Sequence, residues 1–236
     1  MNDLKVVILC GGKGHRLRPL TSSIPKPMVR LNGKPILQHI IEFYIRSGFN
    51  SFILCTGFKS NVIKKFVSSK KFKADIEISD AGEQASMLKR LYKARHLMGK
   101  KVIVTYGDTF INIDSHRLIN KHNKGNAKAT ITVANIRSPF GLVRLGRNKK
   151  VLSFDEKPLL PHYIGHMILD RDILDDLDRC LIRMPDGEGL VSLFKKLISE
   201  GKLNSYEHSG LQITFNTVHE HKKAEEEFIK FFTGGE

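Results

Sequence analysis

Tryptophan is absent from this 236-residue chain, and aromatic residues make up only 8% of it. Cysteine is also scarce: Cys10, Cys55 and Cys180 are odd in number and widely spaced, a pattern that suggests neither a disulfide framework nor a zinc site. No apolar run approaches the ~20 residues that span a bilayer, and the first one is too short for a signal-peptide core. We therefore expect a protein of the reducing cytoplasm with no membrane segment.

Acidic residues are in short supply as well. Against 39 basic residues there are 24 acidic ones, a formal net charge of +15. Such a surplus can indicate nucleic acid, an anionic surface or a phosphorylated substrate. The basic residues are scattered, however, and no aromatic–basic motif of RNA-binding domains is present. The charge is thus compatible with polyphosphate ligands, with a solvated basic surface as the alternative, and no nucleic-acid partner is expected.

Strand-like apolar runs alternate with amphipathic helical patterns in the first half of the chain. The expected strands are residues 4–10, 51–56, 74–79 and 101–106, and the expected helices are residues 35–47, 60–68, 86–98 and 114–123. This alternation predicts βαβ units and a parallel sheet.

The second half is less regular. Its expected strands are residues 128–136, 142–145, 151–155, 203–207 and 211–215, and its expected helices are residues 171–179, 189–200 and 219–232. No repeat, linker or low-complexity segment marks a boundary. We predict one domain over residues 1–236, a three-layer α/β fold whose mixed, largely parallel sheet takes antiparallel strands in its second half.

A glycine-rich segment, residues 11–21, directly follows the first predicted strand. Clustered glycines there can present bare backbone N–H groups to phosphate oxygens. The segment is not a dinucleotide-binding fingerprint, whose third glycine would fall on Leu17, and it lacks the Gly-Lys-Ser/Thr of a Walker loop. Taken alone, a tight turn between strand and helix remains the alternative.

Lys26 lies between Pro25 and Pro27. Each proline fixes its own φ and restricts the residue before it, so this lysine is held on a stiff stretch of backbone close to the glycine segment. A flexible surface lysine needs no such bracing, and this arrangement favours a site for an anion.

Together these motifs resemble the signature of the sugar-1-phosphate nucleotidylyltransferase family, and within it most closely that of the glucose-1-phosphate cytidylyltransferases. The resemblance continues along nearly the whole chain. It is carried by Gly11-Gly12-x-Gly14-x-Arg16-Leu17-x-Pro19-Leu20-Thr21, Pro25-Lys26-Pro27-Met28, Gly33-Lys34-Pro35, Tyr106-Gly107-Asp108, Phe140-Gly141, Phe154-x-Glu156-Lys157-Pro158 and Glu207-His208-x-Gly210.

The resemblance implies a Rossmann-like nucleotidyltransferase fold and a set of site residues. The catalytic residues would be Arg16, Lys26 and Asp108. The nucleotide-binding residues would be Leu9, Gly11, Gly12, Gly14, Glu83 and Gly107. The acceptor-binding residues would be Gly141, Glu156, Lys157 and Gly165, with Lys157 on the acceptor's phosphate and Glu156 near a sugar hydroxyl. Without the family, a surface turn would be the better interpretation of Glu156-Lys157-Pro158.

The expected cofactor is Mg²⁺. Asp108 follows a predicted parallel strand, at the sheet edge where such folds bind ligands, and Mg²⁺ prefers one or two carboxylates together with phosphate oxygens and water. The register from His208-x-Gly210 places Asn216 where the family has a second metal ligand, usually aspartate. Asp108 and Asn216 are the predicted metal ligands.

The predicted reaction moves a nucleoside monophosphate from an NTP to a sugar 1-phosphate and releases pyrophosphate. CTP is favoured, but residues 82–87 lack the glycine pair of the cytidylyltransferases, so GTP, UTP or dTTP stays open. Residues 163–166 replace a glycine-rich sugar loop, so a non-sugar phosphate acceptor stays open too. A catalytically silent nucleotide-binding subunit is the alternative of another class, and a homo-oligomer is left open.

The histidines of the second half of the chain give weaker evidence for a functional site. His219 and His221 are two residues apart, do not share a helix face, and are not expected to form a metal site. His166 could contact the acceptor, and a structural histidine is an equally good interpretation.

Overall fold

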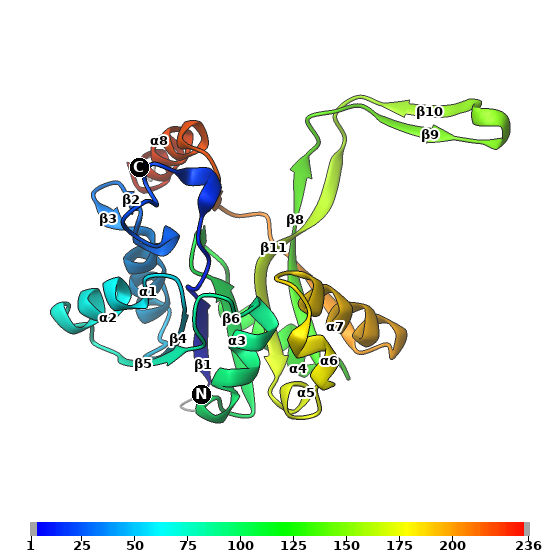
Figure 1. The fold of residues 1–236 in the computed structure, drawn as a ribbon. Helices are drawn as coiled ribbons and strands as arrows, with labels where there is room; N and C mark the ends of the chain where they lie inside the picture. The colour runs from blue at the N-terminus through cyan, green and yellow to red at the C-terminus, as the bar shows by residue number, and fades with distance from the viewer. Residues whose placement is uncertain (1–3, 234–236) are drawn as a thin grey trace.

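A seven-stranded mixed sheet forms the centre of the protein (Figure 1). This computed structural model describes residues 4–233. Across the sheet the strand order is β12-β8-β11-β6-β1-β4-β5. The strands are β1 (Lys5–Leu9), β4 (Ser51–Thr56), β5 (Asp75–Asp80), β6 (Lys101–Tyr106), β8 (Ala129–Arg137), β11 (Leu159–Asp170) and β12 (Leu203–Glu207).

Pairing is parallel throughout this sheet except along β11, which is antiparallel to both of its neighbours, β6 and β8. The prediction of a mixed, largely parallel sheet is therefore confirmed. Two short strand pairs lie beside it: β2 (Arg30–Leu31) pairs with β3 (Lys34–Pro35), and β7 (Thr109–Ile111) pairs with β13 (Gln212–Thr214).

Helices cover both faces of the sheet (Figure 1). Side chains of β1 alternate between the two layers: Val6 and Ile8 join one buried cluster, whereas Val7 and Leu9 join the other. The first cluster includes α1 (Ile36–Arg46), α2 (Ser60–Ser69) and α8 (Val218–Thr233), with α4 (Ser115–Asn123) on the same side; the second includes α3 (Met87–Ala94), α5 (Asp172–Asp175), α6 (Arg179–Arg183) and α7 (Glu188–Ser199).

Strand β11 is the main element that the sequence did not predict. Its apolar run is interrupted by Pro161 and Gly165, and its register with β8 shifts between Tyr163 and Met167. Gly165 has φ of +73°, a conformation that favours glycine. Because of these irregularities, the sequence pattern does not indicate this twelve-residue strand, which lies between β6 and β8 in the sheet.

The predicted helix over residues 171–179 is wrong in extent. The structure has the short α5 there and a separate α6 after it. Asp178 is extended rather than helical, and its side chain accepts a hydrogen bond from the Cys180 backbone N–H. This N-cap starts a new helix, which explains the break.

A hairpin projects from the body between β8 and β11 (Figure 1). It consists of β9 (Leu142–Leu145) and β10 (Val151–Asp155), which pair with each other in a separate two-stranded sheet. We call residues 138–158 the arm. Its base continues the β8–β11 ladder, since the Ser138 N–H donates to the Pro158 carbonyl at 2.9 Å.

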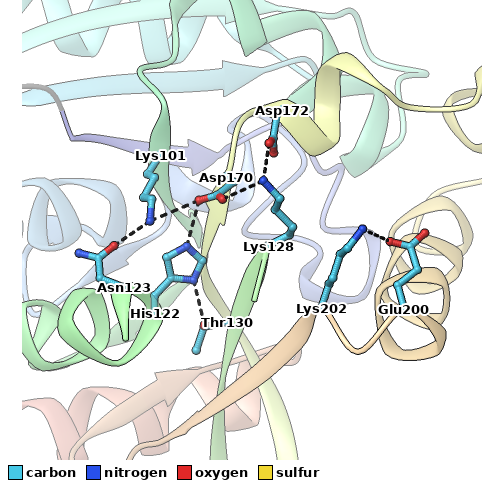
Figure 2. Close-up of polar contacts among 9 residues, drawn as sticks. All are labelled: Lys101, His122, Asn123, Lys128, Thr130, Asp170, Asp172, Glu200 and Lys202. Carbon is cyan, nitrogen blue, oxygen red and sulfur yellow. Dashed lines mark hydrogen bonds and ion pairs between the residues drawn. The ribbon is translucent and has the colours of Figure 1, made fainter. Parts of the chain in front are cut away.

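A polar network occupies the edge of the sheet where β6 and β8 begin (Figure 2). The buried His122 imidazole contacts Thr130 Oγ1 through Nδ1 at 2.9 Å and Asp170 Oδ1 through Nε2 at 3.1 Å. Lys128 adds a 3.4 Å contact to the same carboxylate. This edge is opposite the one where β6 leads to Asp108, so the network joins α4, β8 and β11 rather than building a site.

None of the helices formed by residues 4–233 combines the length and apolar character needed to cross a bilayer.

Candidate active site

A cavity of about 600 Å³ opens at the carboxyl ends of β1 and β6. It is lined by the glycine segment, the residues that follow β6, the middle of β11 and the strand β13. Its lining residues are Leu9, Gly11, Gly12, Lys13, Gly14, His15, Arg16, Leu17, Lys26, Pro27, Met87, Arg90, Tyr106, Asp108, Thr109, Tyr163, Ile164, Gly165, Asp186, Gln212, Thr214 and Asn216.

Close backbone packing explains two glycines beside the cavity. Gly14 has φ of +61°, and a Cβ there would lie 3.1 Å from Lys26 Cβ. A Cβ on Gly107 would lie 2.9 Å from the Leu9 carbonyl oxygen, which accepts the Gly107 N–H. Any larger residue would therefore push the glycine segment away from Lys26 or part β1 from the turn after β6.

Lys26 stands at the centre of a charged cluster. Its ammonium nitrogen lies 2.7 Å from Asp108 Oδ2 and 3.2 Å from Asn216 Oδ1. Arg16 reaches the same amide oxygen at 3.1 Å. Lys26 is buried in the short helix Lys26–Met28, whose proline neighbours hold it as the sequence predicted. Residues 190 positions apart are thus brought to one point, with two cations facing the cavity.

The donor set at this point fits Mg²⁺. Asp108 supplies a carboxylate and Asn216 an amide oxygen, and both oxygens contact one ammonium group, so they are close enough to share a cation. Mg²⁺ takes one or two such protein ligands and completes its shell with phosphate oxygens and water. Among the described residues no group of three or more histidine, cysteine or acidic side chains could hold a metal, so a purely protein-bound metal centre is not built here.

Asn216 is itself positioned by Glu220. The Asn216 backbone N–H donates to Glu220 Oε2 at 2.7 Å, at the start of α8. His221 Nε2 contacts the Arg30 carbonyl at 2.6 Å and does not face the cavity.

Arg90 is a central residue of the cavity that the sequence did not single out as functional. Its buried guanidinium donates to four backbone carbonyls: Thr56 at 2.5 Å, Gly82 at 3.0 Å, Gly11 at 3.2 Å and Glu83 at 3.3 Å. Its acceptors are backbone atoms, which leave no pattern in the sequence. One signal was available: Arg90 falls on an amphipathic helix at a position that the helix buries.

Glycines make room for the Arg90 side chain. A Cβ on Gly11 would lie 2.1 Å from Arg90 Cζ, and a Cβ on Gly57 would lie 2.1 Å from its Nη1. Burial lowers the pKa of this guanidinium, and the negative charge of Asp186 acts in the opposite direction. Arg90 therefore ties the glycine segment, the end of β4 and the loop before α3 into one wall of the cavity.

The loop before α3, residues 81–86, lies behind the cavity wall, because Arg90, which lines the cavity, donates to the carbonyls of Gly82 and Glu83. Glu83, predicted to bind the nucleotide, does not line the cavity, and its carboxylate lies 4.0 Å from Lys13 Nζ. The neighbouring wall is built by Met87 and by Asp186, whose carboxylate accepts the Met87 N–H at 2.8 Å. Sequence reasoning included Met87 in the stretch 82–87 without giving it a role, and it missed Asp186, which comes from a segment 99 positions away.

The predicted acceptor residues divide into two groups. Gly165 lines the cavity, where a Cβ would lie 2.6 Å from the Tyr106 ring. Gly141, Glu156 and Lys157 lie on the arm and do not line it. Lys157 is exposed, has φ of +46° and faces Glu156 Oε1 at 3.6 Å. The structure thus brings only one of the four to the cavity.

His166 is a structural residue. It is fully buried, with Nε2 2.7 Å from the Tyr44 hydroxyl and Nδ1 2.9 Å from Thr132 Oγ1. Burial, reinforced by His208, lowers its pKa to about 3. The contact with an acceptor that the sequence left open is not supported, because both ring nitrogens already have protein partners.

Comparison with known proteins gives a consistent result. A family model described as nucleotidyl transferase matches residues 5–228. A probable glucose-1-phosphate cytidylyltransferase of Bacillus subtilis (strain 168) is 31% identical over 238 residues, covering 91% of this chain and 92% of its own. A D-glycero-alpha-D-manno-heptose 1-phosphate guanylyltransferase of Campylobacter jejuni is 31% identical over 180 residues, covering 73% and 79%.

Among solved structures, HddC from Yersinia pseudotuberculosis superposes with a TM-score of 0.75 at 23% identity, covering 95% of this chain and 99% of that one. This likeness shows that the two chains share a fold.

Proposed function

Because the chain belongs to the nucleotidyl transferase family, we propose that it transfers a cytidylyl group from CTP to a sugar 1-phosphate and releases pyrophosphate. Enzymes named as sugar-phosphate nucleotidylyltransferases are its relatives over most of its length. The observation that carries the reaction type is the cluster of Lys26, Arg16, Asp108 and Asn216 at the mouth of a glycine-lined cavity.

The proposed chemistry is an in-line displacement. An oxygen of the acceptor's phosphate attacks the α-phosphorus of the NTP, a new P–O bond forms, and the bond to pyrophosphate breaks. That oxygen is already ionised at neutral pH, so no general base is needed, and catalysis rests on positioning and charge neutralisation. Lys26 would neutralise the α-phosphate region, and Arg16 would stabilise the departing pyrophosphate.

Asp108 and Asn216 would hold Mg²⁺. When bound, the ion neutralises nucleotide phosphate oxygens. The Lys26 ammonium would then move from the two ligand oxygens toward the α-phosphate. The glycine segment would accept the nucleotide against its backbone N–H groups, with Gly107 allowing close approach of the turn after β6.

Cytosine is the proposed base because the cytidylyltransferase likeness covers 91% of this chain, against 73% for the guanylyltransferase. On the acceptor side, Gly165 would line the sugar pocket. Gly141, Glu156 and Lys157 would contribute only when the base of the arm comes over the cavity.

A matrix of reactions tests the proposal. Pyrophosphate release is measured for CTP, UTP, GTP and dTTP, each with a panel of sugar 1-phosphates and with non-sugar phosphates. We expect release with CTP and one sugar 1-phosphate to exceed the other pairs by at least tenfold. Release with another base would overturn the base assignment alone. Tight NTP binding without release for any pair would support a catalytically silent subunit instead.

A further inference from the structure

Basic charge is concentrated in the first third of the chain. Residues 4–74 contain 14 of the 39 basic residues but only one of the 24 acidic ones, Glu42. They form β1, the glycine segment, α1, β4 and α2, which Figure 1 draws in blue to cyan toward the β5 end of the sheet. A charge asymmetry of this kind is typical of proteins that meet an anionic partner with one part of their surface.

Four exposed lysines of this part lie where α2 ends. Since β4 and β5 are parallel, α2 runs back from the end of β4 to the edge of the sheet where β5 begins. The second half of α2 and the turn that follows it carry these lysines, all of them at the surface. We call this group the lysine patch, and its members are Lys65, Lys70, Lys71 and Lys73.

Two phenylalanines fix the shape of the lysine patch. The rings of Phe66 and Phe72 meet edge to face with centroids 5.9 Å apart, and both rings pack partly buried against the first core cluster. The Lys70 N–H also donates to the Phe66 carbonyl at 3.1 Å. These contacts hold residues 70–73 against the last turn of α2. The apolar side chains of this segment thus serve the core, and the patch offers charge to a partner rather than apolar area.

Carboxylates do not neutralise the lysine patch. Among the described residues, none of its four ammonium groups has an acidic side chain within ion-pair distance. Lysines nearby differ in this respect: Lys64 pairs with Asp80 at 3.1 Å, and Lys202, at the other end of the same sheet edge, pairs with Glu200 at 3.0 Å (Figure 2). Four ammonium groups without counter-charges repel one another, and an anionic partner would remove that cost.

We propose that the lysine patch binds the surface of a bilayer that contains anionic phospholipids. Clusters of four to eight basic residues on a protein surface are attracted to such bilayers, and each lysine strengthens binding by about fivefold. The ammonium group is a compact point charge, which suits lipid headgroups that have no fixed arrangement. Nucleic acid fits the patch less well, because the patch has no arginine fork and its two aromatic rings are packed against the core instead of being free to stack on bases.

The position of the patch is compatible with an active enzyme at a membrane surface. The cavity opens at the carboxyl ends of β1 and β6, whereas the patch lies at the opposite edge of the sheet, where β5 begins. A protein bound through the patch would therefore turn its cavity away from the lipid and leave it open to soluble substrates. This attachment is electrostatic and needs no membrane-spanning helix.

Co-sedimentation of the full chain with lipid vesicles tests the proposal. The vesicles contain about 30 mol% phosphatidylglycerol in phosphatidylcholine, in about 0.05 M NaCl so that screening is weak. Four lysines at about fivefold each predict a partition coefficient on the order of 10³ M⁻¹. Binding should be lost with pure phosphatidylcholine, and also in about 1 M NaCl, where the Debye length falls to about 3 Å.

Paired substitutions separate the patch from the charge of the whole chain. Lys70→Gln/Lys71→Gln removes two charges of the patch and should lower the partition coefficient by about 25-fold. Lys65→Gln/Lys73→Gln removes the other two and should have the same effect. The matched control is Lys195→Gln/Lys196→Gln, an exposed lysine pair on α7 that loses the same charge and should bind like the wild type. Circular dichroism establishes that each variant is folded.

Three results would overturn the proposal. One is a wild type that does not sediment with anionic vesicles at low salt. The second is an equal loss of binding in the patch and control variants, which would assign the attraction to the total charge of the chain. The third is binding to duplex DNA of random sequence that exceeds binding to vesicles and falls in Lys70→Gln/Lys71→Gln, because the patch would then serve nucleic acid.

Discussion

At the scale of single residues, Asp108 is the most informative position. Asp108→Asn keeps the shape of the side chain but removes the charge that faces Lys26 and would hold Mg²⁺. We expect the turnover number to fall by about 10²–10³-fold, in line with the loss of one preorganised electrostatic group. Pyrophosphate release at several Mg²⁺ concentrations measures it.

The control for this change is Asp172→Asn, which removes an exposed carboxylate at the opposite edge of the sheet. It should leave turnover within twofold of wild type, a rough margin for surface changes. Near-normal turnover in Asp108→Asn at saturating Mg²⁺ would show that Asp108 is not the metal ligand.

Arg90 is the second residue for which the structure predicts a specific effect of substitution, on both stability and KM. Lysine offers one ammonium centre where the guanidinium spans four carbonyls from separate segments. Arg90→Lys should leave buried carbonyls without donors and lower stability by about 2–3 kcal/mol. Because these carbonyls belong to the wall of the cavity that we propose binds the nucleotide, KM for the NTP should rise while KM for the acceptor stays nearly constant.

Urea unfolding and initial-rate kinetics measure the two effects. Arg46→Lys, at the exposed end of α1, is the matched control and should change neither. An Arg90→Lys protein with wild-type stability and an unchanged NTP KM would mean that the four carbonyls are satisfied without the guanidinium.

Lys157 tests the arm's part in acceptor binding. If its ammonium docks the acceptor's phosphate, Lys157→Ala should raise KM for the sugar phosphate by about tenfold or more, as expected for loss of a charged hydrogen bond, with KM for the NTP unchanged. Lys124→Ala, on the far side of the sheet, serves as the control. If both variants have the same kinetic constants, Lys157 does not bind the acceptor. Glu156-Lys157-Pro158 would then be only a surface turn, which is the interpretation that these three residues favour without the family.

The sequence predicted those residues of the cavity whose position can be inferred from the residues next to them in the chain. Lys26 is fixed by its flanking prolines, and the structure holds it buried beside the glycine segment. Asp108 comes shortly after β6, which lies beside β1 in the sheet, so the sequence placed it at the same edge as the glycine segment. Arg90 and Asp186 could not be found in this way, because their partners are backbone atoms of distant segments.

At the scale of elements, strands buried on both faces were the easiest to predict, and β11 was the hardest. Its proline, its glycine and its register shift break the pattern that marks a strand, yet cross-strand pairing with β6 and β8 outweighs them. The hairpin strands β9 and β10 were predicted within their observed bounds, whereas their projection from the body depends on tertiary packing that periodicity does not encode.

Strand β11 also contributes a dependence of stability on pH. The pKa of His166 falls to about 3 in the folded protein, against about 6.5 in the unfolded chain. Below pH 6.5 the unfolded state binds a proton that the folded state does not, so stability is lost as pH falls from about 6.5 toward 3. At pH 5 this one residue costs about 2 kcal/mol.

Urea unfolding at pH 8, 7, 6 and 5 measures this loss. His166→Gln cannot titrate, so its free energy of unfolding should fall less steeply below pH 6.5, even if its stability at pH 8 is lower. His96→Gln, on the surface, should keep the wild-type slope. A slope unchanged by His166→Gln would assign the acid sensitivity to another group, with the buried His122, whose pKa burial also lowers, as the next one to replace.

At the scale of the whole molecule, the two helical layers share one sheet. Adjacent residues of β1 point into opposite clusters, so neither layer can lose its core without exposing the other face of the same strands. Because of this shared sheet, we expect the chain to unfold as one unit. A single domain over residues 1–236, as predicted from the sequence, should behave in this way.

The absence of tryptophan makes this prediction measurable. Phe66→Trp places a single indole in the layer of α2, and Phe194→Trp places one in the layer of α7; both positions are partly buried against their clusters. If the layers unfold together, the two fluorescence transitions in urea should share one midpoint and coincide with the loss of circular dichroism. Midpoints that separate by more than the difference in the variants' own stabilities would instead divide the molecule into two cooperative units.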